Sequence, residues 1–321
     1  MQSITLITLI LRALERAHTQ PVFDRDPYES RRTALKGEML LKALIVSSLL
    51  KSPTQRGLLE TVDNSPELQT ALGGSLKRNT LSNALQQRDP AQMVEAWSLV
   101  LEHYQPQIAR TGKKFARIAA VDASLIKLSL AAFSWAAYRE KSGAAKMSVL
   151  LQWGKQIPSQ LVFTNGKVAD VRAAQKLVWA AHWTYLFDRG YFGFAFLTRV
   201  LEAGAHFVIR FKDGVDYQIV ERAPVPKTPK KAGFRVTSDW LIRLPGWDPE
   251  LQLRMVSYQL PDRRLIRVLT DRFDLSAASI ARLYKERWTI EVYHKSLKQN
   301  ASLEKSPIRT ETNHLFASLC A

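Results

Sequence analysis

The chain has 321 residues, which is long enough for a well-buried core and for two domains. It carries 46 lysine and arginine residues against 29 acidic ones, so the net charge is 46 − 29 = +17 and the pI is near 10.0. A surplus of that size predicts a polyanionic partner, with nucleic acid favoured over an anionic membrane. The apolar run Leu40–Leu50 is too short for a membrane span and is interrupted by Lys42. The apolar run Ile4–Leu11 lacks the basic N-terminal region and the cleavage site of a signal peptide. We therefore expect no membrane partner and a cytoplasmic location.

Few side chains of this sequence suit a soft metal ion. The single cysteine, Cys320, excludes a disulfide or a thiolate zinc site within one chain. Six histidines are scattered, with no pair at metal-binding helical spacing. Any metal must therefore be held mainly by carboxylates, which favours a hard ion that prefers oxygen ligands.

The first 110 residues are predicted to form an all-α N-terminal domain. Helical segments bounded by Pro, Gly and Asn are expected at Ile4–Ala17, Arg31–Leu50, Pro66–Leu85 and Ala91–Tyr104. Polar residues that could contact phosphates occur in two groups, namely Arg31 and Arg32, and then Lys77, Arg78, Asn79, Thr80, Ser82 and Asn83. A solvated basic face on a helical bundle is the alternative interpretation.

Residues 111–321 change to a strand-like texture and are predicted to form an α/β domain. Strands are expected at Arg117–Val121, Met147–Trp153, Gln160–Phe163, Thr184–Phe187 and His206–Phe211. Helices are expected at Ala169–Ala181 and Phe192–Ala203. Three strands followed by alternating strand and helix predict an RNase H-like mixed sheet with flanking helices.

A β-rich insertion is predicted at about residues 212–272, which a minimal fold of this kind would not need. Alternating apolar residues indicate four strands there, at Val215–Val220, Arg235–Leu244, Leu251–Leu260 and Arg264–Thr270. The helix that follows the insertion is expected to contain Tyr284–Lys298.

Four polar positions of that helix share one face. At about 100° per residue, Tyr284, Arg287, Glu291 and Lys298 fall within an arc of roughly 60°. A neighbouring arc is apolar and would dock on the core, through Leu283, Ile290, Tyr293 and Leu297. The alternative is a solvated face on which Arg287 and Glu291 form an i,i+4 pair.

Three acids could meet in such a fold. Asp122 and Asp188 each follow an apolar strand, where a carboxylate is half desolvated, and Glu291 lies on the helix after the insertion. A turn or cap residue is the alternative for Asp122, and an ion pair with an adjacent-strand arginine for Asp188. Three like charges within a few ångströms stay ionised only around a cation, which predicts a metal site.

Mg²⁺ is the expected ion, with Mn²⁺ as a substitute, because Mg²⁺ takes carboxylate, phosphate and water oxygens. Two such ions about 3.5–4 Å apart can activate a water or a 3′-hydroxyl on one side and stabilise the leaving oxygen on the other. Phosphodiester cleavage and strand transfer are then one reaction with different nucleophiles.

The motifs resemble those of IS4-family DDE transposases. The pattern Y-x2-R-x3-E-x6-K is similar to the family's YREK signature, Asp122-Ala123-Ser124 to its first D-x-S/T element, and Phe187–Phe192 to its D-R-G-Y box. Asn165–Asp170 is similar to the family's G-x-x-x-D loop. These elements occur in the family's order over roughly residues 117–300.

The resemblance implies roles for six side chains. Asp122, Asp188 and Glu291 would bind the catalytic metals, whereas Tyr284, Arg287 and Lys298 would contact the DNA end. Family members also stack a flipped base on a tryptophan. The candidates here are Trp240, Trp247 and Trp288, with core filling as the alternative interpretation.

The implied function is that of an insertion-sequence transposase. It would bind terminal inverted repeats through residues 1–110 and act through residues 111–321, by metal-dependent hydrolysis and strand transfer in a cut-and-paste reaction. Its partners would be double-stranded DNA at transposon ends and target, and a second copy in a synaptic homodimer at the bacterial nucleoid. The alternatives are a transposase-derived DNA-binding protein without catalysis and an RNase H-like host nuclease. Only 321 − 298 = 23 residues follow Lys298, as expected of a truncated, frameshifted or short variant.

Overall fold

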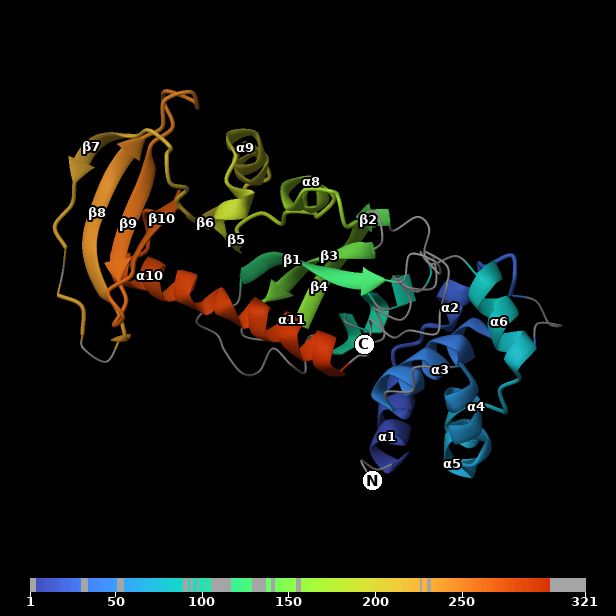
Figure 1. The fold of residues 1–321 in the computed structure, drawn as a ribbon. Helices are drawn as coiled ribbons and strands as arrows, with labels where there is room; N and C mark the ends of the chain where they lie inside the picture. The colour runs from blue at the N-terminus through green and yellow to red at the C-terminus, as the bar shows by residue number, and fades with distance from the viewer. Residues whose placement is uncertain are drawn as a thin grey trace.

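Among the residues that the structure describes, ten strands join into a single mixed sheet with helices on both faces, which confirms the predicted mixed α/β fold. The computed structural model describes residues 4–29, 34–50, 55–88, 92, 95–96, 98–100, 102–104, 117–128, 137–139, 142–153, 157–225, 227–229 and 232–300. The N-terminal helices lie at one end of the molecule and the last four strands at the other (Figure 1).

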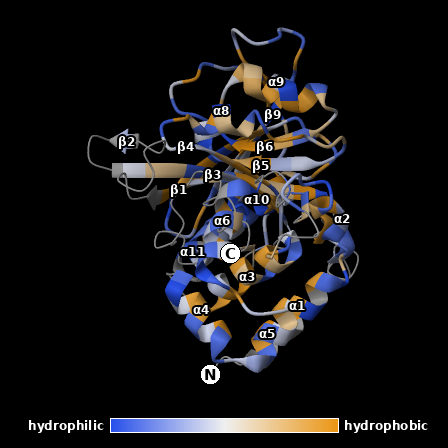
Figure 2. Cartoon of the chain, turned by 90° about the vertical axis from the view of Figure 1, so that its right-hand side faces the viewer, coloured by the Kyte–Doolittle hydropathy of each residue, from blue (hydrophilic) through white to orange (hydrophobic). Residues whose placement is uncertain are grey.

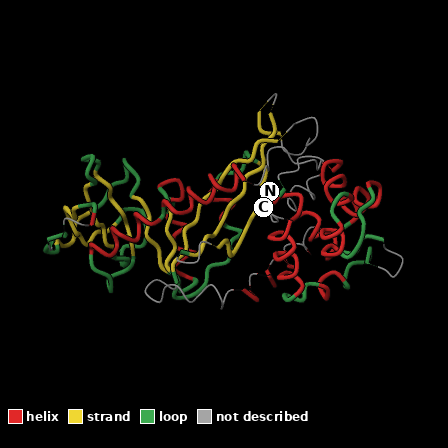
Figure 3. Tube along the Cα trace, turned by 90° about the horizontal axis from the view of Figure 1, so that it is seen from below, coloured by secondary structure: helices red, strands yellow, loops and turns green. Residues whose placement is uncertain are grey.

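The N-terminal residues that the structure describes form a group of helices set apart from the strands (Figure 3). Their bounds are α1 (Ile4–Glu15), α2 (Gln20–Phe23), α3 (Gly37–Leu49), α4 (Gln55–Asp63), α5 (Pro66–Leu72) and α6 (Arg78–Gln87). Apolar side chains at helical spacing, such as Leu40 and Leu44 or Leu81 and Leu85, meet in one buried cluster. Described positions between 92 and 104 are also helical, whereas Arg31, Arg32 and residues 105–116 lie outside the described part.

The prediction of one continuous helix over Pro66–Leu85 is wrong. Gly73 adopts φ 90°, and the amides of Gly73 and Gly74 both donate to the Gln69 carbonyl, at 3.0 and 2.9 Å. This left-handed glycine ends α5, because a residue with a side chain would be strained there. The chain therefore turns through residues 73–77 before α6 begins.

The strand order of the sheet is β2-β3-β1-β5-β6-β10-β9-β8-β7, with β4 also paired to β3. The strand β5 runs parallel to β1 and to β6, and the other pairs are antiparallel. The strand bounds are β1 (Ile118–Leu128), β2 (Ala137–Arg139), β3 (Ser142–Gln152), β4 (Ile157–Asn165), β5 (Thr184–Phe187), β6 (His206–Arg210), β7 (Gln218–Arg222), β8 (Arg235–Arg243), β9 (Leu253–Gln259) and β10 (Leu265–Thr270).

The four strands of the predicted insertion are present, and they continue the main sheet. The strand β10 pairs with β6 through Val268 opposite Arg210 and Thr270 opposite Val208. The strands β9, β8 and β7 then follow outward by antiparallel pairing. Backbone hydrogen bonds therefore connect this region directly to the strands that carry the candidate site.

A hydrophobic layer lies between the sheet and the helices on each of its two faces (Figure 2). Alternate residues along a strand point to opposite faces, so Val121 and Phe187 pack with α9 while Ala120 and Leu186 face α10 and α11. The elements after β4 are α8 (Asp170–Ala174), the 3₁₀ turn η4 (Arg189–Tyr191), α9 (Phe194–Glu202), α10 (Ala277–Glu286) and α11 (Trp288–Asn300).

Two predicted element lengths are wrong. The strand β1 does not end before Asp122 but continues to Leu128, because β3 supplies partners as far as Gly143. The helix expected over Ala169–Ala181 ends at Ala174. The side chain of Gln160 there accepts a bond from the Val178 amide and donates one to its carbonyl, each at 2.8 Å, which holds that residue beside β4.

The helix expected over Tyr284–Lys298 is interrupted at Arg287. The amide of Arg287 bonds to the Tyr284 carbonyl and that of Ile290 to the Arg287 carbonyl, at three-residue spacing and 3.1 Å each. This tighter turn divides the segment into α10 and α11. No helix among the described residues is both long and apolar enough to cross a membrane.

Candidate active site

Asp122 and Asp188 come from adjacent parallel strands in matching register. The paired residues end with Ala120 opposite Leu186, and Asp122 and Asp188 each lie two residues further along the chain, with Asp188 just past the end of β5. The charge of Asp188 is close enough to raise the pKa of Asp122. Residues in register on neighbouring strands are about 5 Å apart and point to the same side. Since Ala120 and Leu186 belong to the layer under α10 and α11, both aspartates face those helices.

Asp188 is also fixed by its own backbone. Its carboxylate accepts a hydrogen bond from the Gly190 amide at 2.8 Å and so caps the short turn η4. A side chain on Gly190 would approach that carboxylate to 3.0 Å, which explains the glycine at this position.

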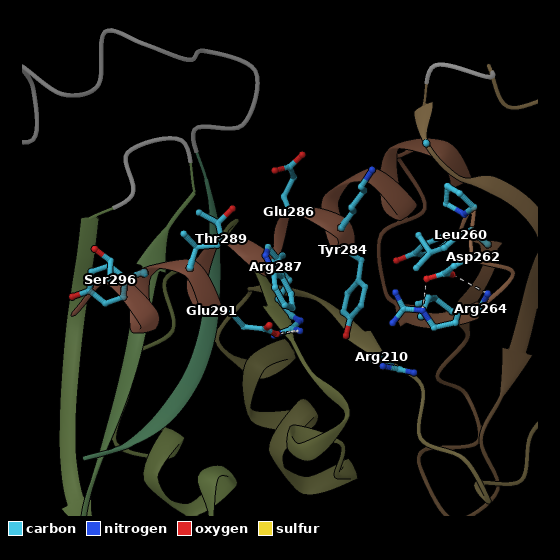
Figure 4. Close-up of a pocket in the computed structure, with 18 residues that line it drawn as sticks. Arg210, Leu260, Asp262, Arg264, Tyr284, Glu286, Arg287, Thr289, Glu291 and Ser296 are labelled. Carbon is cyan, nitrogen blue, oxygen red and sulfur yellow. Dashed lines mark hydrogen bonds and ion pairs between the residues drawn. The ribbon is translucent and has the colours of Figure 1, made fainter. Parts of the chain in front are cut away.

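Glu291 lies in the first turn of α11 and pairs with Arg287. The guanidinium Nη2 donates to Glu291 Oε1 at 2.6 Å, and Figure 4 shows the two side chains meeting below the helix. The guanidinium carbon also lies 5.7 Å from the centre of the Tyr284 ring. The predicted i,i+4 pair therefore exists, but it is half-buried rather than solvated, with 15% of the Arg287 side chain exposed.

A cavity of about 360 Å³ brings the first and third acids together. Its walls contain Asp122 and Ser124 from β1, and Glu291, His294, Lys295 and Lys298 from α11. Lys298 is exposed and extends the polar face of the helix beyond Glu291. Two of the residues predicted from helical spacing, Glu291 and Lys298, thus share one surface with Asp122.

The three carboxylates influence one another electrostatically. Burial raises the pKa of Asp122 to about 6, and repulsion from Asp188 and Glu291 adds to the increase. The Ala123 amide and the charge of Arg287 act in the opposite direction. Burial is thus the main reason that the ionised form of Asp122 is disfavoured, and the two neighbouring acids add to it.

Two polar side chains beside the acids were missed in the sequence, His294 and Tyr191. The Nε2 atom of His294 lies 3.7 Å from Asp122 Oδ2, and burial lowers the pKa of the imidazole to about 4, so it is neutral at pH 7. Neither ring nitrogen nor the Tyr191 hydroxyl has a hydrogen-bond partner among the described residues. Burial and the charges of Asp122, Asp170 and Asp188 raise the pKa of Tyr191. His294, three residues after Glu291, could have been found by the same helical arithmetic.

A larger cleft of about 1160 Å³ opens on the other side of Arg287. It lies between α10, the start of α11 and the last strands, and Glu291 belongs to its wall as well. Cationic side chains and aromatic rings line it, namely Arg210, Arg264, Lys285, Arg287, Tyr258, Tyr284, Trp288 and Tyr293. Arg210 at the end of β6 was not predicted; the only signal for it was its place directly after an apolar strand.

The three candidate tryptophans differ in their surroundings. Trp240 and Trp247 pack against the hydrophobic layer of α9, where Trp247 stacks on Phe194 at 5.1 Å and donates to Thr198 at 2.9 Å. Trp288 is 64% exposed on the wall of the larger cleft. The core-filling interpretation therefore suits the first two, and Trp288 is the ring available to a ligand.

The donor set around Asp122 suits a hard cation in its chemistry. It includes the carboxylates of Asp122 and Glu291 in one cavity, with the charge of Asp188 close enough to act on Asp122. Across the residues that the structure describes, no three acidic, histidine or cysteine side chains are arranged to hold a metal ion. The pairing of Glu291 with Arg287 accounts for this, since it directs the third carboxylate toward a cation of the chain.

Comparison with known proteins identifies the family of this chain. Residues 113–321 match the family described as "Transposase DDE domain". The chain belongs to that family.

Two curated relatives are also transposases by name. The chain is 29% identical over 248 residues to "Putative transposase y4zB" of Sinorhizobium fredii, covering 75% of this chain and 68% of the relative. It is 27% identical over 206 residues to "Probable transposase for insertion sequence element IS5377" of Geobacillus stearothermophilus, covering 63% of this chain and 54% of that protein. The chain thus spans between half and about two thirds of their lengths.

Among solved structures, a chain of the piggyBac transposase synaptic complex with hairpin DNA overlaps 98% of this chain and 73% of its own length. The TM-score is 0.44 at 11% sequence identity. Because the TM-score and the sequence identity are both low, no conclusion about the fold or the site follows from this likeness.

Proposed function

We propose that the protein is an insertion-sequence transposase of the IS4 type that binds the terminal inverted repeats of its element, cleaves there and joins the freed ends to target DNA. The observation that carries this proposal is that Asp122 on β1 and Glu291 on α11 line one cavity, with Asp188, just past the adjacent strand β5, close enough to act on the charge of Asp122. A reaction at a phosphodiester needs its charge neutralised and its nucleophile oriented, and carboxylates gathered at one sheet position serve both needs through a cation.

Mg²⁺, or Mn²⁺ in its place, is the ion that these carboxylates would hold. Asp122, Asp188 and Glu291 would provide its protein ligands, and when bound it would lower the pKa of the attacking water or 3′-hydroxyl and stabilise the leaving oxygen. The mutual repulsion that raises the pKa of Asp122 supports this assignment, because a cation would relieve it.

Arg287 would exchange partners when DNA binds. In the free protein its guanidinium neutralises Glu291 at 2.6 Å. A DNA phosphate in the cleft would offer the same planar, bidentate anion, which would release the Glu291 carboxylate toward Asp122. Tyr284, whose ring lies beside Arg287, and Lys298 on the same face would contact the neighbouring backbone.

The fold supports the same assignment. The order β4-β3-β1-β5-β6, with the first three strands antiparallel and the next two parallel to β1, is the arrangement expected of an RNase H-like sheet. In this proposal residues 1–110 form an all-α DNA-binding domain, residues 111–321 the catalytic domain, and Trp288 is the ring placed to stack on an unpaired base. Two copies would assemble on paired DNA ends.

The deciding experiment measures cleavage and strand transfer on DNA that carries the element's own ends, with Mg²⁺ or Mn²⁺. Wild type is compared with Glu291→Gln and with the matched control Glu286→Gln. Glu286 lies one turn earlier and points away from Glu291 in Figure 4, and glutamine keeps an acceptor for its 3.4 Å bond from Trp153. We expect the Glu291 variant to bind DNA but lose cleavage by at least about 10³-fold, and the control to keep activity within about threefold.

Other outcomes would point to other proteins on the same fold. End-specific binding by wild type with no metal-dependent cleavage would indicate a DNA-binding protein derived from a transposase. Cleavage directed by DNA structure or RNA hybrids, without strand transfer, would indicate a host nuclease. Either result would overturn the transposase assignment.

A further inference from the structure

Three helices of the N-terminal group form a compact unit with two short connections. The helix α4 is followed after Asn64 and Ser65 by α5, and α5 by α6 after the glycine turn at residues 73–77. Ser65 caps α5 by accepting the Leu68 amide at 3.3 Å, and Gly73 ends it. The helix α4 packs on both α5 and α6. A helix, a glycine-containing turn and a second helix docked on a third is the helix-turn-helix arrangement.

The last helix of this unit has two contrasting sides. Its apolar residues Leu81, Ala84 and Leu85 are buried at the spacing of one helical stripe. The opposite side carries Asn79, Asn83 and Gln87, each four residues apart and each exposed. Figure 1 shows α6 on the outer side of the helical group, away from the sheet.

The charged residues of the segment that contains this exposed side are positive. Lys77 and Arg78 are exposed where α6 begins, and no acidic residue occurs between Glu67 and Asp89 in the sequence. With the net charge of +17, this side of the molecule is complementary to a polyanion. The family match begins only at residue 113, so it assigns no role to α6.

A buried ion cluster fixes the end of α6. Arg88 directly follows it, and its guanidinium bonds to Asp26 at 3.1 Å, to Glu29, and to the Leu35 carbonyl at 2.8 Å. The helix is thereby anchored to the α2 and α3 segments. A rigidly held polar helix surface can present its side chains to a ligand whose hydrogen-bonding groups are regularly spaced.

We propose that α6 is a recognition helix that lies in the major groove of double-stranded DNA and reads base edges with Asn79 and Asn83. Lys77 and Arg78 contact the flanking phosphates and carry no sequence information. Gln87 and Ser82 extend the polar surface along the same groove. This inference rests on the proposed function, since it names the element that recognises the DNA ends.

The dimensions of α6 agree with this role. Its exposed asparagines are four residues apart, about 6 Å along the helix axis, which is close to two base-pair steps of about 3.4 Å. A side-chain amide can donate to the N7 atom and accept from the N6 amino group of one adenine, a pairing that the major groove alone presents. We therefore expect A·T pairs about two positions apart in the recognised sequence.

The test selects double-stranded DNA from a random pool with the full chain and then compares variants on the selected sequence. Asn79→Ala and Asn83→Ala are each expected to weaken binding to that sequence about 10- to 100-fold and to relax selection at one or two adjacent base pairs. Binding to a scrambled sequence should stay within about twofold. The matched control is Asn64→Ala, which alters an exposed amide outside α6.

A second variant separates phosphate contacts from base contacts. Lys77→Ala is expected to weaken binding to selected and scrambled DNA equally and to lower the salt dependence by about one unit of log K per log salt. Arg56→Ala on α4, an exposed cation of the same unit, should change neither quantity. Thermal unfolding of every variant verifies that it is folded.

Unchanged selection by both asparagine variants would overturn the inference, and so would the absence of any selected sequence for wild type. If end-specific cleavage and strand transfer persist in the asparagine variants with unaltered sequence preference, the assignment of α6 as recognition helix is wrong and the proposed function stands. If selection depends on α6 but no DNA is cleaved, that assignment is correct and the catalytic proposal fails.

Discussion

Two buried groups of charged side chains differ in how completely they are neutralised. In the N-terminal helices, Arg88 is 1% exposed and bonds to two carboxylates, Asp26 and Glu29, and to a backbone carbonyl. Under α11, Asp122 faces two further acids, and its neighbours His294 and Tyr191 have polar atoms without partners among the described residues.

The difference distinguishes buried charges that stabilise the fold from buried charges that are available to a ligand. A buried charge that is paired in the folded protein supports the fold only while its partners remain. A buried charge that is left in excess costs stability in the free protein and is retained where a ligand can neutralise it. Substitutions in the two groups should therefore change stability in opposite directions.

The largest effect is expected at Arg88. Arg88→Met removes the cation and leaves Asp26 and Glu29, each 4% exposed, without their shared partner. We expect a loss of about 3–5 kcal/mol in the free energy of unfolding, measured by urea denaturation at pH 7.5. A loss below about 1 kcal/mol would show that the pair contributes little.

The opposite sign is expected at Asp122. Folding raises its pKa from 3.8 to about 6, so its ionised form is disfavoured in the native state, and stability falls as the pH rises from about 4 to about 6. Asp122→Asn removes that cost and should stabilise the metal-free protein by about 1–3 kcal/mol at pH 8, but not at pH 4. Denaturation in EDTA at both pH values measures it; equal effects at both would contradict the electrostatic explanation.

A smaller gain is expected at Tyr191. The side chain is fully buried among Phe187 and Phe196, and its hydroxyl has no hydrogen-bond partner in the part of the chain that the structure describes. Tyr191→Phe deletes only that hydroxyl, so the free energy of unfolding should rise by about 1 kcal/mol. Thermal unfolding of the metal-free protein tests this. Destabilisation would reveal that the hydroxyl has a hydrogen-bond partner after all.

The smallest effect is expected at an exposed pair. Arg56 and Glu60 on α4 are 2.8 Å apart, but their side chains are 87% and 60% exposed. Arg56→Ala should reduce stability by about 0.5 kcal/mol or less, because solvent screens such pairs. Repeating the urea measurement in 1 M salt should remove even that difference, which sets the baseline for Arg88→Met.

Most strands along the chain could be predicted from the sequence because apolar runs are local signals. The mixed sheet and the helix face of Glu291 both followed from such periodicity. The length of β1 could not, since it depends on partners supplied by β3 across a long sequence separation. The early end of α8 depends likewise on a side chain from β4, Gln160.

The i,i+4 spacing of Arg287 and Glu291 predicted their contact, but it did not predict that the pair is half-buried. Helical arithmetic places the two residues on one face, whereas their burial depends on the cleft formed with strands far away in the sequence. The break between α5 and α6, in contrast, had a local signal in Gly73 and Gly74, which the prediction of one helix over Pro66–Leu85 did not use.

The outermost strand β7 bears on how the sheet can meet other proteins. All five of its residues are exposed, it includes Glu221 and Arg222, and its register with β8 shifts between Ile219 and Glu221. Charges and an irregular register at an open edge disfavour pairing with another strand. This edge is therefore protected against pairing with the edge strands of neighbouring molecules. Aggregation through it should stay low even at high protein concentration.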